Sequence, residues 1–264
     1  MQLTLPPFRR EEGPAVPLGP LPAFEASEEY VSLGLPGLGT IQISVDEIVL
    51  RAPDDAIAEA TQARLGAWGE GQWFALQGCL VVQGATVARS GRAVAIVGPS
   101  RAGSSVTAIQ LTRLGFGLVS DGYTVVAEGG AVMARKPVAS VDSIIAERLF
   151  PDLPREPRPS GRARASVTAP GHTDAELVAC AVLNVRSGHD EILVHSIGGD
   201  RILGCRMRPF LRGVPGTGPI LTESVEHLPT WSFTRKNPES MDDFLRIGPP
   251  SVATAIAEAV AELM

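Results

Sequence analysis

Residues 98–105 read Gly-Pro-Ser-Arg-Ala-Gly-Ser-Ser, and the predicted fold follows from this segment and its neighbours. The segment has the frame of a phosphate-binding loop. In such a loop, glycines let backbone N–H groups close around phosphate oxygens, a lysine reaches the β- and γ-phosphates, and a Ser or Thr hydroxyl sits on Mg²⁺. Here Ser104 occupies the lysine position and Ser105 the magnesium position. The sequence therefore predicts a degenerate P-loop that binds phosphate and is less suited to transferring it.

The segments on both sides of the loop have the pattern that a P-loop requires. Residues 93–97 are wholly apolar, as in a strand buried on both faces, and residues 106–114 form a helical pattern with Gly115 as its left-handed cap. The next strand begins over residues 116–120. This βαβ-type unit gathers ligands at the carboxyl ends of its strands. We predict an α/β fold with a P-loop. The alternative is a strand-to-helix turn kept for packing alone.

Loop residues are the candidates for holding a cofactor, either ATP or another phosphate ligand: Gly98, Ser100, Arg101, Gly103, Ser104 and Ser105. The helix N-terminus adds partial positive charge that does not depend on a lysine. Ser104, however, removes a full charge from the loop. A charge-assisted hydrogen bond contributes about 1.5–3 kcal/mol, so nucleotide affinity is expected to fall by about tenfold to a hundredfold.

Two side chains are candidates for catalysis, Arg101 and Asp121. Arg101 is placed to fold back over the phosphates and replace the lysine, whereas loop arginines more often point to solvent. Asp121 ends its predicted strand in the position of a Walker B acid. There it would hold Mg²⁺ together with Ser105, or accept a hydroxyl proton. The alternative is a turn-forming aspartate before Gly122.

Composition predicts a soluble cytoplasmic protein. The 264 residues are 44% hydrophobic, with a net charge of −6, which disfavours nucleic acid and anionic membranes as partners. The N-terminus lacks an apolar signal core, and no apolar run is long enough to span a bilayer. The three cysteines have no CxxC spacing, which argues against a disulfide framework or a zinc site.

Proline-rich segments mark the organisation of the chain. Residues 1–23 are predicted to be a flexible arm, and residues 24–264 a single domain. Prolines among arginines over residues 151–170 predict a mobile basic loop, either solvated or closing over an acidic or phosphorylated substrate. We also expect a hairpin around Gly129-Gly130, two strands at 177–185 and 191–196 around the Ser187-Gly188 turn, and a C-terminal helix.

Three segments resemble the HPr kinase/phosphorylase family: Leu-Gln-Gly at 76–78, Gly-Arg-Ala-Val-Ala-Ile-Val-Gly-Pro-Ser at 91–100, and Leu-Gly-Phe-Gly-Leu-Val-Ser-Asp at 114–121. More narrowly, the chain looks like the smaller kinase-like relatives found in bacterial biosynthetic clusters. The resemblance is best over about residues 75–130. It implies a P-loop kinase-like fold related to that of phosphoenolpyruvate carboxykinase, with a mixed sheet flanked by helices. It also implies use of ATP and Mg²⁺ and phosphorylation of a serine hydroxyl, and a homo-oligomer, either a hexamer or a smaller ring, is consistent with it. This chain departs from the family's pattern at Gln77, Ser104 and Gly122, where the family has a histidine, the P-loop lysine and a second acid.

Three hypotheses for function share an HPr-kinase-like, phosphate-binding loop. The first is a divergent ATP-dependent phosphotransferase acting on a hydroxyl of a peptide or small metabolite, with Arg101 replacing the lysine and with Ser105 and Asp121 on Mg²⁺. The second is a catalytically silent pseudokinase that presents a peptide or carrier to a partner enzyme. The third is an enzyme that uses the cradle for a phosphate- or diphosphate-bearing metabolite, with its chemistry supplied by acids elsewhere.

Overall fold

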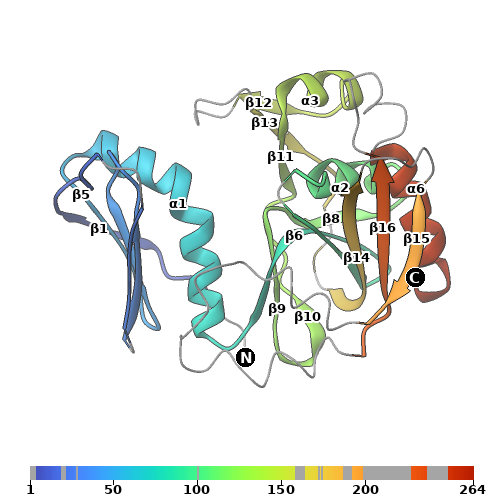
Figure 1. Cartoon of the computed structure of the whole chain (residues 1–264), viewed down its shortest axis with the longest axis horizontal. Helices are drawn as coiled ribbons and strands as arrows, with labels where there is room; N and C mark the ends of the chain where they lie inside the picture. Colours follow the sequence, from blue (N-terminus) through green and yellow to red (C-terminus); the bar gives the residue numbers. More distant parts are fainter. Residues whose placement is uncertain are drawn as a thin grey trace. The chain divides into compact units, whose positions relative to one another are not determined.

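The computed structural model describes residues 4–18, 22–27, 29–99, 101–157, 164–171, Thr173, 175–186, 192–198, 227–236 and 249–264. The chain divides into two compact units, with a boundary between Val81 and Val82. The sequence predicted a single domain over 24–264. The structure has one sheet largely before this boundary and the others after it, and the domain organisation stays a prediction. Each unit is described by itself below (Figure 1).

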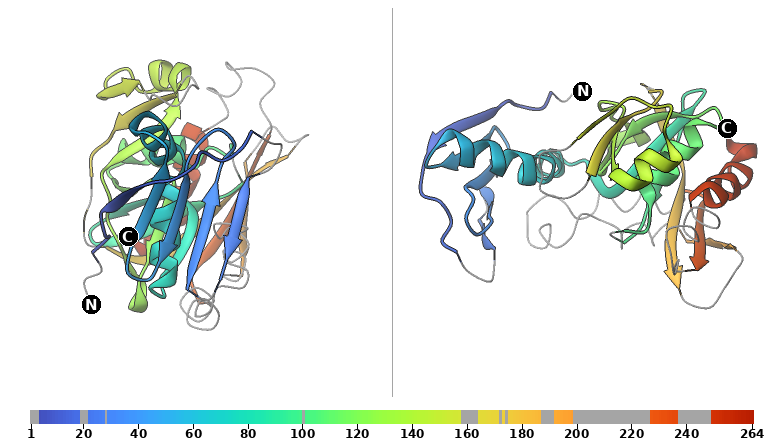
Figure 2. Two further views of the ribbon diagram at one scale, coloured as in Figure 1. Left: turned by 90° about the vertical axis from the view of Figure 1, so that its left-hand side faces the viewer. Right: turned by 90° about the horizontal axis from the view of Figure 1, so that it is seen from above.

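The first unit is a five-stranded sheet with a long helix, and its strand order is β1-β5-β4-β3-β2. Its elements are β1 (Phe8–Glu12), β2 (Ala23–Ala26), β3 (Tyr30–Gly34), β4 (Thr40–Ser44), β5 (Ile48–Ala52) and α1 (Asp55–Leu76). The α1 helix packs on β4 and β5 and lies along one face of the sheet (Figure 2). Alternating apolar residues of β4, Ile41 and Ile43, are fully buried under it.

Local capping explains where α1 begins and ends. The Asp54 side chain accepts a hydrogen bond from the Ile57 N–H (2.8 Å), as an N-cap residue does. At the other end, Gly78 takes a left-handed conformation (φ 82°) that stops the helix. The Gln77 side chain donates to the Val45 carbonyl (2.6 Å), so this residue anchors the helix end to the β4–β5 turn.

Part of the proline-rich N-terminal segment, which was predicted to be a flexible arm, forms a strand. Phe8–Glu12 pairs in parallel with β5 along its whole length. Beyond it, the Val16 N–H donates to the Leu38 carbonyl (2.7 Å). A parallel edge strand tolerates flanking prolines, and Pro7 and Pro14 fall just outside β1. Part of the segment 1–23 is therefore integral to the first unit.

The second unit is built on a mixed sheet with the order β10-β9-β6-β7-β14-β16-β15, in which β8 also pairs with β6. Its strands are β6 (Leu80–Arg89), β7 (Arg92–Val97), β8 (Gly117–Ser120), β9 (Tyr123–Val126), β10 (Ala131–Val132), β14 (Ala175–Arg186), β15 (Leu193–Ile197) and β16 (Thr230–Lys236). Three neighbours, β7, β14 and β16, run parallel, so their carboxyl ends meet at one edge. This edge is where an α/β sheet binds ligands.

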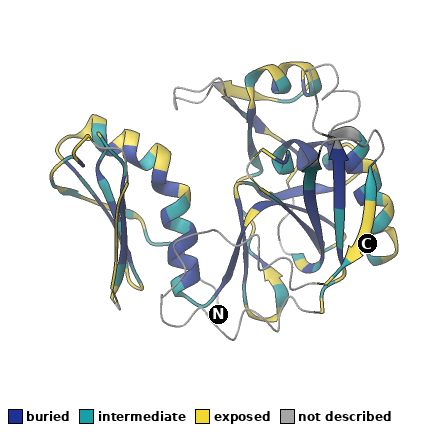
Figure 3. Ribbon diagram, in the orientation of Figure 1, coloured by how far each residue is buried: buried dark blue, intermediate teal, exposed yellow. Residues whose placement is uncertain are grey.

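Two longer helices pack against each other in this unit: α2 (Ser104–Thr112) and α6 (Pro249–Ala259). Their apolar residues join a core that includes Ile96, Ile109, Phe233 and Ile256, all of them buried. The described residues of this unit also include two short 3-10 turns, η1 (Glu128–Gly130) and η3 (Ala261–Leu263). In Figure 3 the central strands β14 and β16 are largely buried, whereas the edge strand β15 is largely exposed. The predicted C-terminal helix is confirmed.

A small three-stranded sheet includes parts of the segment 151–170, which was predicted to be a basic loop, and residues 158–163 of that segment lie outside the described residues. Its strands, in the order β11-β13-β12, are β11 (Val138–Asp142), β12 (Arg155–Pro157) and β13 (Arg164–Thr168), and α3 (Ser143–Leu149) follows β11. The apolar residues of β13, Ala165 and Val167, are buried in the main core. The free energy gained by burying these two apolar side chains favours a strand here, although the prolines and arginines around them favour a loop.

Strand pairing confirms the predicted hairpin. The hairpin around Gly129-Gly130 is present, with Val132 opposite Val126. The strands predicted at 177–185 and 191–196 are also present, yet they do not pair with each other, because β16 lies between them. No strand was predicted at Thr230–Lys236, where β16 lies. Among the described helices, none combines the length and the apolar character needed to cross a membrane.

Candidate phosphate-binding site

The predicted loop starts where a fully buried strand ends. All five residues from Ala93 to Val97 in β7 are inaccessible to solvent, which confirms the prediction of a strand buried on both faces. The chain then turns at Gly98, where a side chain has no room. A Cβ there would lie 2.8 Å from the Leu183 carbonyl oxygen of β14 and 3.1 Å from the Ala102 Cβ. Gly98 is thus fixed by the packing of the loop against the neighbouring strand.

Two residues of the loop have left-handed backbone conformations, Arg101 (φ 72°) and Gly103 (φ 98°). For a non-glycine residue such a conformation costs free energy, of the order of 1–3 kcal/mol, and it is concentrated at functional sites. The Ala102 N–H donates to the Pro99 carbonyl (3.0 Å) and closes a tight turn between them. Ser100, another predicted ligand of phosphate, lies outside the described residues.

Helix α2 opens directly from this turn. Gly103 is its N-cap residue and has no side chain to cap the helix, and the first intrahelical bond runs from the Thr107 N–H to the Gly103 carbonyl (2.9 Å). The first N–H groups of a helix have no intrahelical acceptor and carry the positive end of the helix dipole. Ser104 and Ser105 are the first two residues of α2, and both are half-buried. The arrangement suits an anion at the start of α2.

Arg101 is exposed to solvent, as the alternative in the sequence analysis expected. No ion pair of Arg101 is found in the part of the chain that the structure describes. Its side chain leaves from the middle of the loop, between Pro99 and Gly103, and a long guanidinium side chain can reach a ligand bound there. The role of Arg101 over the phosphates stays a prediction.

Asp121 lies at the same edge of the sheet as the loop. Strands β7 and β8 both run antiparallel to β6, which lies between them, so the two strands end in the same direction. Two strand spacings separate them, about 10 Å. The Asp121 Oδ2 accepts a hydrogen bond from the Ser140 backbone N–H (2.9 Å), which ties β11 to the end of β8. Asp121 therefore has a structural contact, and a carboxylate retains further acceptor capacity for a metal or a hydroxyl group.

A metal ion bound at the sheet edge beside the loop would be coordinated by few protein ligands. No group of three or more His, Cys, Asp or Glu side chains that could hold a metal occurs within the described ranges. Mg²⁺ is usually bound by one or two carboxylates together with substrate phosphates and water, rather than by an all-protein cage. The Ser105 hydroxyl and the Asp121 carboxylate fit that limited donor set. Both remain predicted Mg²⁺ ligands.

Arg235 of β16 is a site residue that the sequence analysis missed. Only 5% of it is exposed, and its Nη2 donates to the Ala102 carbonyl oxygen inside the loop (3.3 Å). Burial lowers the pKa of its guanidinium from the ordinary value. The alternation of Trp231 and Phe233 with Ser232 and Thr234 is a strand signal in the sequence. However, nothing in the sequence near Arg235 predicts that the end of this strand lies beside the loop.

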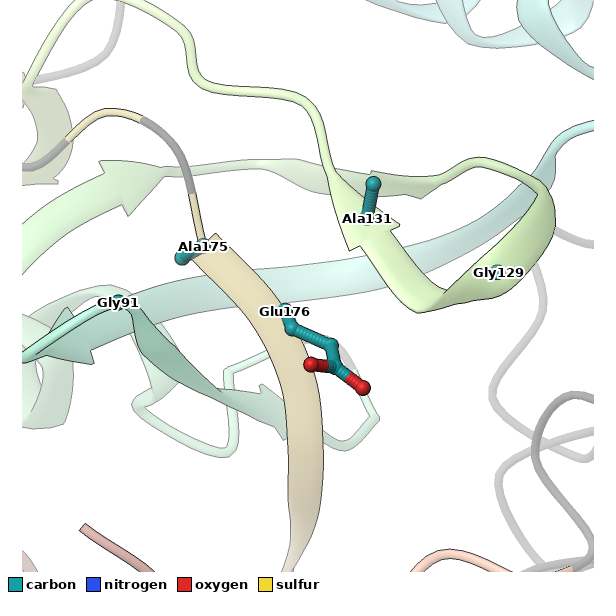
Figure 4. A pocket seen from close by; sticks show the side chains of 5 residues that line it. All are labelled: Gly91, Gly129, Ala131, Ala175 and Glu176. Atoms are coloured by element: carbon teal, nitrogen blue, oxygen red, sulfur yellow. The ribbon is translucent and has the colours of Figure 1, made fainter.

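A separate open hollow of about 350 Å³ lies at the opposite end of β7. Its lining consists of Gly91, Gly129, Ala131, Ala175 and Glu176 (Figure 4). Gly91 precedes β7, whereas the phosphate-binding loop follows this strand. Its described lining includes none of the predicted site residues, and Glu176 is the one charged residue among them. The candidate site is therefore the loop and not this hollow.

Comparisons with known proteins add little to this geometry. No protein-family model and no curated protein matches the sequence. Among solved structures, the chain is similar to the Hpr(Ser) kinase/phosphatase from Coxiella burnetii, with a TM-score of 0.32 and 11% sequence identity over 69% of this chain and 93% of that chain. This is a weak likeness to an HPr-kinase-like α/β fold, too low to assign an activity or individual residues.

Proposed function

We propose that the second unit binds a phosphate-bearing ligand, a nucleotide or a phosphorylated metabolite, at residues 98–105. The observation that carries this proposal is the turn in front of α2, with Arg101 and Gly103 both left-handed. Left-handed residues of this kind occur in backbone nests, whose N–H groups bind anions. The Ala102 N–H already donates to the Pro99 carbonyl, so the groups proposed for the ligand are those of Gly103 and of the first turn of α2. The turn stands at the carboxyl end of a buried strand, which is where α/β sheets bind their ligands.

Charge at the loop supports the same proposal. The dipole of α2 favours an anion at its start, and Arg101 is free of ion pairs within the described residues. A guanidinium also matches the oxygens of a phosphate group through paired N–H donors. We infer that Arg101 closes over the outer face of the bound phosphate. The loop itself then supplies backbone N–H groups, and the serines at 104 and 105 supply hydroxyl groups.

Phosphoryl transfer from ATP to a hydroxyl group is the second candidate function, and the position of Asp121 favours it. This carboxylate lies at the same sheet edge as the loop and is anchored by the Ser140 N–H. When bound, Mg²⁺ would neutralise phosphate charge, with Ser105 and Asp121 as its protein ligands. Asp121 would also orient the acceptor hydroxyl. The silent pseudokinase and the enzyme for a diphosphate-bearing metabolite keep the same loop and differ in the fate of the ligand after it binds.

Calorimetry with ATP, ADP and inorganic diphosphate, each with and without Mg²⁺, tests the proposal on the full chain. We expect binding of at least one of these ligands, and we expect Arg101→Ala to weaken it by up to about tenfold, because an exposed charged contact is partly screened by solvent. Arg92→Ala is the matched control, since Arg92 is exposed at the opposite end of β7.

The pattern across the ligands separates the alternatives. A phosphotransferase binds ATP with Mg²⁺ and turns it over, whereas a silent pseudokinase binds ATP without turnover. The metabolite enzyme binds diphosphate and rejects ATP. Absence of binding for all three ligands, in a protein that is folded by circular dichroism, would contradict the proposed function.

A further inference from the structure

A buried arginine of β16, Arg235, reaches the loop from a strand that does not pair with β7, because β14 lies between the two. In the register of the sheet, Val97 of β7 lies opposite Val182 of β14, and Val185 of β14 lies opposite Arg235 of β16. Arg235 is therefore three residues further toward the carboxyl ends than the last residue of β7, about 10 Å along the strands. At that level β7 has already ended and the loop has begun.

Burial of the Arg235 charge costs free energy, and new contacts of the guanidinium must offset this cost. Arg235 is 5% exposed, and a charged group taken out of water loses hydration that its new contacts have to replace. Its Nη2 donates to the Ala102 carbonyl oxygen at 3.3 Å. A guanidinium has five N–H donors in a fixed plane and stays protonated even when buried. The loop thus has a permanent positive charge two residues before the position where its lysine is missing.

We propose that Arg235 supplies the cation that the loop lacks at Ser104, and that it stabilises the negative charge of the phosphate group bound there. This inference rests on the proposed function. A guanidinium bonded to the loop favours ligands with several closely spaced anionic oxygens, such as a diphosphate or the phosphate chain of a nucleotide, because its N–H donors match such oxygens.

A purely structural role for Arg235 makes a different prediction. In that case the guanidinium holds the Ala102 carbonyl and so fixes the turn between Pro99 and Gly103. Loss of the side chain would then weaken phosphate binding through distortion of the loop. A positive charge introduced elsewhere in the loop would not replace the lost hydrogen bond, so binding would stay weak if Arg235 is only structural. If Arg235 acts through its charge, the introduced charge would restore binding.

Relocation of the charge distinguishes the two roles. Four proteins are compared by calorimetry with inorganic diphosphate and with ATP plus Mg²⁺: the natural chain, Arg235→Met, Ser104→Lys, and the double variant. We expect Arg235→Met to weaken binding by about tenfold to a hundredfold, as for the loss of a charge-assisted contact. Ser104→Lys should recover most of this loss in the Arg235→Met background. In the natural background it should add little, because two like charges then share one site.

Arg155→Met is the matched control. Its guanidinium also donates to backbone carbonyls, those of Ala146 and Phe150 at the end of α3, but it does not contact the loop. We expect this variant to bind diphosphate as the natural chain does. Circular dichroism and thermal unfolding establish that every variant is folded. If Arg235→Met does not fold, Arg235→Lys takes its place: affinity kept within about threefold supports the role of the charge, and a larger loss indicates that the guanidinium fork is needed for the loop.

Two results would overturn the inference. In the first, Arg235→Met binds both ligands as well as the natural chain does. In the second, the double variant binds no better than Arg235→Met, which assigns Arg235 to the loop's structure alone. Either result leaves the proposed function standing as long as the natural chain binds phosphate ligands. Failure of the natural chain to bind any of them would instead contradict the proposed function itself.

Discussion

Gly98→Ala is expected to abolish phosphate binding and to lower the free energy of unfolding by about 1–3 kcal/mol, the usual cost of overpacking. The new Cβ would meet the Leu183 carbonyl oxygen at 2.8 Å, and this atom belongs to the backbone of a central strand that cannot move aside. The loop must therefore shift, and its N–H groups shift with it. Chemical denaturation of the full chain measures the stability, and calorimetry with diphosphate measures the binding.

Gly91→Ala at the other end of β7 is the control for Gly98→Ala. Gly91 has a left-handed conformation (φ 77°), and a Cβ there would meet no atom within 4 Å. The substitution should cost about 1–2 kcal/mol of backbone strain and leave phosphate binding intact. Equal binding by the Gly98→Ala and Gly91→Ala proteins would show that the ligand does not use this loop.

Asp121→Asn is expected to lower Mg²⁺-dependent turnover of ATP by about 10²–10⁴-fold if the protein is a phosphotransferase, because the amide neither holds the metal well nor accepts a proton. The asparagine side chain keeps an oxygen that can accept from the Ser140 N–H, so the fold should be unchanged. Release of phosphate from ATP, or its transfer to a hydroxyl acceptor, measures the effect.

Asp121→Ala separates the structural contact of this carboxylate from its chemistry. It removes the acceptor of the Ser140 N–H as well as the charge, and we expect it to cost about 1–3 kcal/mol of stability. In a silent pseudokinase, Asp121→Asn would change the Mg²⁺ dependence of ATP affinity and nothing else. If Asp121→Asn left both turnover and Mg²⁺ dependence as in the natural chain, Asp121 would be a purely structural residue.

The loop and its flanking elements were predictable because their signals are local. Five consecutive apolar residues predict a strand buried on both faces, and Gly98, Gly103 and Gly115 mark the turn and the end of the helix. The structure has β7, α2 and β8 in these places. The hairpin at Gly129-Gly130 was predictable for the same reason, since a two-glycine turn needs no information from the rest of the chain.

Pairing between distant strands was not predictable in the same way. The Asp121–Ser140 contact joins two strands that have different partners, and Arg235 reaches the loop only because β14 lies between β7 and β16. No residue near Arg235 in sequence indicates this neighbour. The strands β1, β12 and β13 were missed because prolines and arginines dominate their local composition, whereas their stability comes from partners such as β5 and β11.

The central position of β7 has a consequence for the motions of the protein. This strand is paired on both sides, by β6 and β14, and its last five residues are inaccessible to water. Exchange of its amide hydrogens with solvent should therefore require the whole unit to open, whereas the exposed edge strand β15 can open locally. The loop at Gly98 is attached to the slowest-opening part of the sheet. A loop whose start is anchored in this way loses less conformational entropy when a ligand binds.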